Sequence, residues 1–134
     1  MTTVQTKTTP EARERAGNGC VVFVVAGQPI PKARPRVIEG GSTFTPKATK
    51  EWERAVGWSA LASGVHVIPG NLAVTLNFRR KGKRRADLDN LCKAVLDGLN
   101  GVAYEDDYQV VSLSATVAYS SSKPGVTVEI RRVA

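Results

Sequence analysis

Aspartate and glutamate residues gather in two short clusters whose composition suits a metal-ion site. The first cluster holds Asp87 and Asp89, and the second is Glu105-Asp106-Asp107. Carboxylate oxygens without histidine partners suit Mg²⁺ or Mn²⁺ rather than zinc. The first pair falls at an expected helix start, where the backbone is not yet regular and both carboxylates can face one pocket. A further ligand is then expected from Asp106 or Asp107.

A lysine and a basic run accompany these carboxylates. Lys93 lies one turn after Asp89 and on the same helix face by the i, i+4 rule. A metal ion there would polarise a phosphate and lower the pKa of an attacking water, and the lysine would stabilise the developing charge. The basic residues that directly precede the first cluster are Arg79, Arg80, Lys81, Lys83, Arg84 and Arg85. Together these residues are consistent with metal-assisted cleavage of a phosphodiester.

A second row of cations lies in the proline-rich segment 28–36. Prolines exclude a helix there and hold the backbone extended. Lys32, Arg34 and Arg36 alternate, so an extended chain points all three to the same side. Such a row suits a phosphate backbone, and the alternative is a solvated loop.

Spacing alone leaves a simpler interpretation open. Asp87 would then only cap its helix, and Asp89 and Lys93 would form a surface ion pair, of the kind worth about 0.3–0.5 kcal/mol. The second acidic cluster would be a solvated turn.

Composition favours an anionic partner. The 134 residues carry a formal net charge of +7, yet six of the twelve acidic residues fall between Asp87 and Asp107. Nucleic acid is the commonest partner of such a basic protein. We expect Cys20 and Cys92 to be buried, reduced thiols. No apolar run reaches the roughly 18 residues of a membrane span and no signal peptide is recognised, so we expect a cytoplasmic protein.

The expected architecture is one α+β domain over residues 19–134, preceded by a flexible tail over residues 1–18. The order β-α-β-α-β-β predicts a mixed sheet packed against two main helices. The first strand is continuously apolar, which predicts cover on both faces or an interface on one. The predicted elements are strands 20–26, 72–79, 108–119 and 126–130, a short return strand 43–45, and helices from Pro46, capped by Thr45, to Gly64 and from Leu88, capped by Asp87, to Gly101.

Three blocks of the sequence resemble the RusA family of Holliday-junction resolvases, which occur in bacteria and their phages. Residues Gly27–Arg36 resemble the opening segment of many members. Residues Arg84–Leu99 resemble the central motif, in which basic residues precede D-x-D-N-x-x-K. Residues Asp106–Val110 resemble the third block, D-D-x-Q-V. The match runs from about Cys20 to the C-terminus.

The resemblance implies functions for individual residues. It implies that Asp87, Asp89 and Asp107 bind the metal and that Lys93 is the catalytic lysine, with Asp106 as an additional candidate ligand. Asp97 also matches the motif and is expected to orient Lys93. The resemblance further implies a homodimer that acts on four-way DNA junctions with Mg²⁺ or Mn²⁺.

The leading hypothesis is therefore a homodimeric, metal-dependent endodeoxyribonuclease that resolves four-way junctions in DNA recombination and repair. The gene would belong to a bacterium or a phage. The alternatives are a nuclease for other branched DNA and a non-catalytic junction-binding module. We expect no membrane and no small-molecule substrate. The strands at 20–26 and 110–119 are the candidate dimer interfaces. Asp107 is expected within coordinating reach of Asp87 and Asp89, in one chain or across the interface.

Overall fold

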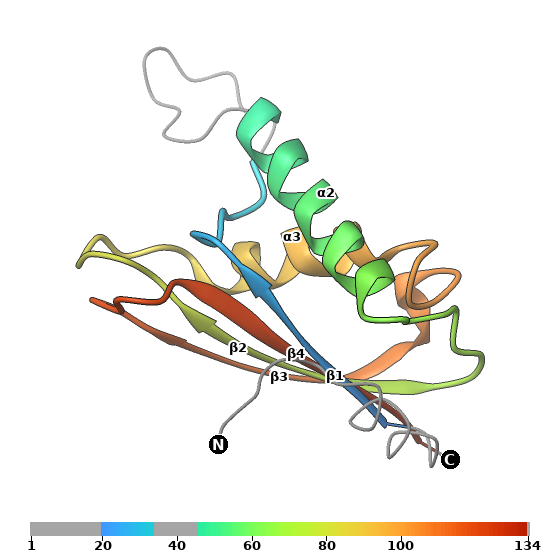
Figure 1. The fold of residues 1–134 in the computed structure, drawn as a ribbon. Coiled ribbons are helices and arrows are strands. Elements are labelled where there is room, and N and C mark those ends of the chain that lie inside the picture. Colours follow the sequence, from blue (N-terminus) through green and yellow to red (C-terminus); the bar gives the residue numbers. More distant parts are fainter. Residues whose placement is uncertain (1–19, 34–45, 134) are drawn as a thin grey trace.

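A computed structural model describes residues 20–33 and 46–133 (Figure 1). The predicted tail, Arg34, Arg36, the return strand 43–45 and the Thr45 cap lie outside these residues. No helix in the described ranges is long and apolar enough to cross a membrane. The elements follow the predicted order: β1 (Cys20–Ala26), α2 (Pro46–Ala62), β2 (Leu72–Arg79), α3 (Leu88–Leu99), the 3-10 turn η2 (Asp107–Gln109), β3 (Val110–Ala118) and β4 (Gly125–Arg132).

The four strands form one mixed sheet in the order β1-β4-β2-β3. β3 is parallel to β2, as expected when a helix, here α3, connects two neighbouring strands. The last strand is antiparallel, as predicted, but its partners are β1 and β2 rather than the preceding strand. The mixed α+β sheet is thus confirmed, and β3 is left at an open edge.

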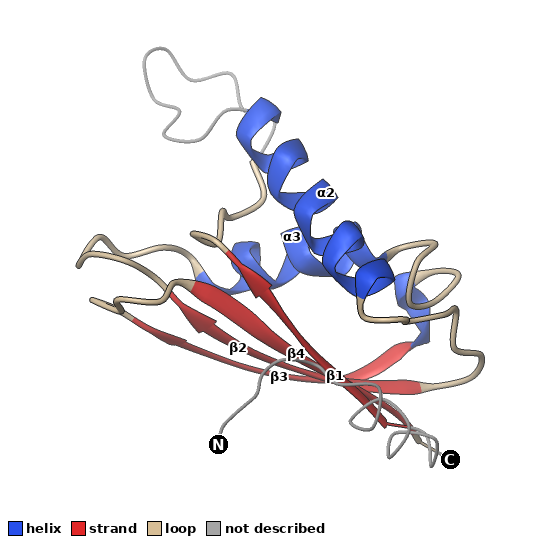
Figure 2. Ribbon diagram, viewed as in Figure 1, coloured by secondary structure: helices blue, strands red, loops and turns tan. Residues whose placement is uncertain are grey.

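Both helices cover the same face of the sheet (Figure 2). Alternate side chains of β2 point to that face, and Leu72, Val74, Leu76 and Phe78 are buried there. α3 presents a complementary apolar face that includes Leu91, Val95 and Leu99, all fully buried. Fully burying a side chain of this kind stabilises the fold by about 1.5–3 kcal/mol. This two-layer core fixes α3 against the sheet.

The outer strands are less covered than the sequence suggested. On β1, Phe23 and Val25 are buried, whereas Val22 and Val24 are 38% and 46% exposed. The prediction of cover on both faces is therefore wrong for this chain, because both described helices lie on one side of the sheet. The alternative, an apolar face available as an interface, remains open. At the other edge, Leu113 of β3 is 46% exposed beside α3.

The two helices approach closely where both carry glycine. A Cβ atom on Gly98 of α3 would lie 2.7 Å from the Glu53 carbonyl oxygen and 3.1 Å from Val56 Cβ. A Cβ atom on Gly57 of α2 would in turn lie 3.2 Å from the Gly98 carbonyl oxygen. Because Gly98 has no side chain, α2 can approach α3 closely. Glu53 of α2 and Asp97, which precedes Gly98 on α3, can then contact the same partner.

Candidate active site

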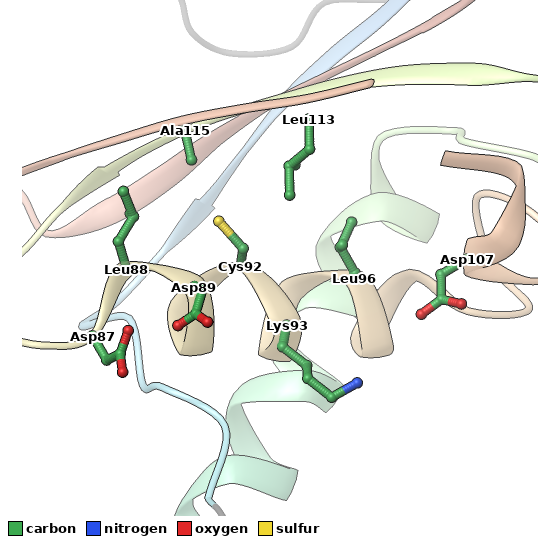
Figure 3. Close-up of a pocket in the computed structure, with 9 residues that line it drawn as sticks. All are labelled: Asp87, Leu88, Asp89, Cys92, Lys93, Leu96, Asp107, Leu113 and Ala115. Atoms are coloured by element: carbon green, nitrogen blue, oxygen red, sulfur yellow. The ribbon is translucent and has the colours of Figure 1, made fainter. Parts of the chain in front are cut away.

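A groove of about 610 Å³ separates α3 from the open edge strand β3. Figure 3 shows Leu88, Cys92 and Leu96 of α3 pointing toward Leu113 and Ala115 of β3. These five residues make an apolar floor. Four charged residues line the same groove along the side of α3: Asp87, Asp89, Lys93 and Asp107. The residues predicted to be catalytic, which come from the central and the third of the three sequence blocks, thus share one groove.

The N-terminal end of the groove carries two exposed carboxylates. Asp87 occupies the N-cap position of α3, as predicted, but its side chain makes no capping hydrogen bond. Instead, Asn90 Nδ2 donates to Asp87 Oδ2 at 3.3 Å. Asp89 lies within the first helical turn, where the unpaired amides favour negative charge. Helix capping is therefore not a sufficient explanation for Asp87.

The other end of the groove carries Asp107, on η2. Burial raises the pKa of its carboxyl, and the neighbouring Asp106 and then Asp97 raise it further, while Lys93 opposes the shift. Lys93 Nζ lies 3.9 Å from Asp97 Oδ1, which agrees with the expectation that Asp97 orients this lysine. Lys93, Asp97 and Asp107 therefore form one electrostatic group.

The two ends do not form one metal site within a single chain. Asp89 and Asp97 are eight residues apart, which is about 12 Å along a helix. Asp107 lies near Asp97, whose charge contributes to the raised pKa of the Asp107 carboxyl. Within residues 20–33 and 46–133, no three His, Cys, Asp or Glu side chains are grouped so that they could hold a metal ion. The expectation that Asp107 reaches Asp87 and Asp89 is wrong within one chain. Coordination across a dimer interface stays a prediction.

The chemistry of the N-terminal pair still fits a hard divalent cation. Mg²⁺ is commonly bound through one or two carboxylates, with water and substrate phosphates completing its octahedral shell. Asp87 and Asp89 supply two such groups on the exposed side of α3, with no histidine or thiolate beside them (Figure 3). Cys92 lies on the apolar floor instead, and burial followed by the charge of Asp89 raises the pKa of its thiol to about 11.

The basic run divides into two groups. Lys81, Lys83, Arg84 and Arg85 are exposed on the loop that leads from β2 into α3. The guanidinium of Arg85 lies 4.9 Å from the centroid of the Tyr119 ring. Ala86 N–H donates to the Tyr119 hydroxyl at 3.1 Å, which ties the end of this loop to the end of β3. The loop therefore presents its cations directly before Asp87.

The first two arginines of the run are part of the fold. Arg80 is 3% exposed and donates to the carbonyl oxygens of Pro29 and Arg84. Burial lowers the pKa of its guanidinium. Arg79, at the end of β2, donates to the Lys123 carbonyl oxygen and to Thr127 Oγ1. These contacts make both arginines poorer candidates for DNA binding than the four exposed cations.

Lys32 is also engaged inside the protein. Its Nζ lies 2.7 Å from Glu53 Oε2 and 2.9 Å from Asp97 Oδ2, and its side chain is 26% exposed. Burial disfavours its charged form, but the hydrogen bonds to the two carboxylates outweigh burial and raise its pKa. The alternation of Lys32 with Arg34 and Arg36 predicts a DNA contact, but residue spacing contains no signal for these two carboxylate partners.

Gln109 is an organising residue that spacing did not single out. It is 7% exposed, and its Oε1 accepts a 2.9 Å hydrogen bond from the Glu105 amide. Its Nε2 donates to the carbonyl oxygens of Ile68 and Gly70, at 2.8 and 2.9 Å. Gln109 thus anchors η2, the turn on which Asp107 lies, to the connection that precedes β2. Its place in the D-D-x-Q-V block was the available signal.

Comparisons with known proteins agree with this arrangement. The family model described as Endodeoxyribonuclease RusA matches residues 26–131. A relative from Bacillus subtilis (strain 168), described as uncharacterized protein YqaN, is 32% identical over 142 residues, which cover 85% of this chain and 97% of that protein. The matched region includes β2, the basic loop, α3, η2 and β3, and therefore the whole groove. The chain belongs to the RusA endodeoxyribonuclease family.

Proposed function

We propose that this protein is a metal-dependent endodeoxyribonuclease that resolves four-way DNA junctions by paired symmetric nicks, in recombination and repair. The observation that carries the proposal is the position of the two exposed carboxylates at the groove, directly after an exposed basic loop. Phosphates held by Lys81, Lys83, Arg84 and Arg85 would arrive beside Asp87 and Asp89. Family membership supports DNA as the substrate and a branched structure as its form.

Each charged residue has a distinct part in this proposal. Asp87 and Asp89 would hold Mg²⁺ or Mn²⁺, and Lys93 would stabilise negative charge on the scissile phosphate or the leaving oxygen. The bound cation would polarise the phosphate and lower the pKa of the attacking water. The exposed cations would contact the DNA backbone rather than the bases, so binding should weaken steeply as salt rises.

A homodimer would meet two requirements of the reaction. Symmetric cuts in two strands need two identical sites related by a two-fold axis. A partner could also bring its own Asp107 to the carboxylates at the N-terminal end of α3, which the Asp107 of the same chain does not reach. The apolar groove floor and the exposed Leu113 at the open β3 edge support this side of the molecule as the interface.

Cleavage of a synthetic four-way junction tests the activity directly. The expected result is Mg²⁺-dependent nicking at symmetric positions in two opposing strands. Flap, fork and linear duplex substrates of the same sequence serve as controls. Preferential cleavage of a flap would favour a nuclease for other branched DNA. Tight junction binding without nicking at any Mg²⁺ or Mn²⁺ concentration would contradict the enzymatic proposal.

Mixed dimers test whether Asp107 acts across the interface. Protomers carrying Asp87→Asn and Asp107→Asn would be co-expressed with two different tags, and the heterodimer would be purified. If each site combines the two residues from different protomers, one site of the heterodimer is intact and single nicks return. If both residues act within one protomer, neither site is intact and the heterodimer stays inactive. Each homodimeric variant is the baseline.

A further inference from the structure

Lys32 lies beside both helices: its backbone bonds to α3, and its side chain contacts α2 and α3. Its amide donates to the Asn90 carbonyl oxygen in the first turn of α3, at 2.8 Å. Its ammonium contacts Glu53 on α2 and Asp97 near the end of α3. The Lys32 side chain therefore spans the two helices, and its backbone is fixed beside the turn that carries Asp89.

The neighbouring residues hold this segment in place. Ala33 N–H donates to Thr49 Oγ1, and Thr49 Oγ1 donates to the Pro31 carbonyl oxygen, both at 3.2 Å. Thr49 is buried on α2. Prolines on the N-terminal side restrict the backbone further. Lys32 is thus directed at its two carboxylates by a segment with little conformational freedom.

Asp97 connects Lys32 to the groove. One of its oxygens, Oδ2, accepts from Lys32, and the other, Oδ1, faces Lys93 Nζ at 3.9 Å. A carboxylate held on one side by a fixed cation has its second oxygen fixed as well. Lys93 is 59% exposed, so Asp97 is the contact that restrains its flexible side chain. A side chain held in one geometry loses less entropy when it engages a phosphate.

We propose that Lys32 is a positioning residue, which acts through Asp97 to hold Lys93 at the groove, rather than a contact for DNA. The proposal rests on the function proposed above for Lys93. It assigns a different role to Lys32 from the one expected for the alternating cations of its segment. The two carboxylates that contact the Lys32 ammonium offset its positive charge, which weakens its attraction for a phosphate.

The salt dependence of junction binding separates the two roles. The slope of log K against log salt is negative, and each phosphate contact that is lost should reduce its magnitude by roughly 0.9. Lys32→Met, which keeps the aliphatic stem, is expected to leave that slope and the junction Kd within about twofold of wild type. Lys83→Met, in the exposed loop, is expected to weaken binding and reduce the magnitude of the slope. Equal reductions in slope for the two variants would overturn the proposal.

Cleavage at saturating junction measures positioning. Lys32→Met is expected to lower the single-turnover rate by about tenfold or more, with the Lys32→Arg variant recovering a large part of the loss. Lys50→Met is the matched control, since Lys50 is an exposed lysine on α2 that contacts neither carboxylate, and its rate should equal wild type. An unchanged rate in Lys32→Met would reject the positioning role.

A double-mutant cycle shows whether the effect runs through Asp97. If it does, Lys32→Met combined with Asp97→Asn should be no slower than Asp97→Asn alone. Losses that multiply would contradict the proposal. Where Lys32→Met fails to fold, because Glu53 and Asp97 then repel each other, the cycle is run in a Glu53→Gln background, which removes one of the two charges.

The same cycle in urea unfolding needs no catalysis. Non-additive changes in the unfolding equilibrium constant are expected for Lys32 and Asp97, and additive changes would show that the two side chains are not coupled. Failure of the proposed nuclease activity would appear as wild-type protein that does not nick a junction. In that case the salt slope and the unfolding cycle still decide whether Lys32 is bound to Asp97 or to DNA.

Discussion

At the N-terminal end of the groove, the exposed Asp87 and Asp89 lie two residues apart in sequence, at the start of one helix. At the other end, Asp107 is held by η2 and Gln109, and Lys93 by Asp97, which Lys32 connects to α2. The first end is built by local sequence. The second end depends on contacts among four separate segments, so its geometry is more sensitive to changes elsewhere in the fold.

The largest expected effect comes from removing a carboxylate at either end. Asp89→Asn and Asp107→Asn should each lower the rate of junction cleavage by about 10²–10³-fold, the loss seen when one electrostatic group of a preorganised site is removed. Junction binding, measured by gel shift, should survive. If both ends serve one site, the double variant should be little slower than either single variant. A loss below tenfold in Asp107→Asn alone would show that only the N-terminal end is catalytic.

Gln109→Ala should damage the second end selectively. The substitution leaves the carbonyl oxygens of Ile68 and Gly70 without a donor and the Glu105 amide without an acceptor. We expect a loss of about 2–3 kcal/mol in the free energy of unfolding, since each of these three part-buried hydrogen bonds contributes about 0.5–1.5 kcal/mol. Urea unfolding measures the loss. Tyr108→Ala, at an exposed neighbouring position, is the control, and an equal effect there would indicate general sensitivity of the turn.

The same contrast explains what the sequence could reveal. Alternating apolar residues in β2 and the helical stripe of α3 predicted those elements well, because their cores are built from local periodicity. The position of Asp87 and Asp89 at a helix start followed from the same pattern. The place of β4 between β1 and β2, the partners of Lys32 and the burial of Arg80 depend on packing between distant segments. Residue type alone made Lys32 and Arg80 resemble the exposed cations of the loop.

Gly98→Ala tests the helix contact behind the second end. Its new Cβ would lie 2.7 Å from the Glu53 carbonyl oxygen, so α2 and α3 would have to separate. We expect a loss of about 2 kcal/mol in the free energy of unfolding, within the range for overpacking a core. Gly57→Ala, whose nearest contact would be 3.2 Å, should cost less. Equal stability of Gly98→Ala and wild type would mean that the helices adjust at no cost.

The smallest effect concerns Cys92, on the groove floor between the two ends. The folded protein holds the pKa of this thiol at about 11, against 9.0 for the ordinary value. Between these values the unfolded chain releases the proton and the folded chain keeps it, so stability falls as pH rises. The wild-type free energy of unfolding should be about 1.4 kcal/mol lower at pH 10 than at pH 7 through this group. Cys92→Ala removes that contribution.

The comparison of the two proteins isolates the thiol, because all other titratable groups are common to both. Urea unfolding of wild type and Cys92→Ala at pH 7, 9 and 10 should therefore give curves that converge as pH rises. Parallel curves would show that the thiol ionises as readily in the folded state as in the unfolded one. Water would then reach the groove floor between Leu88 and Leu96, and the apolar surface assigned to a partner would be hydrated in the free protein.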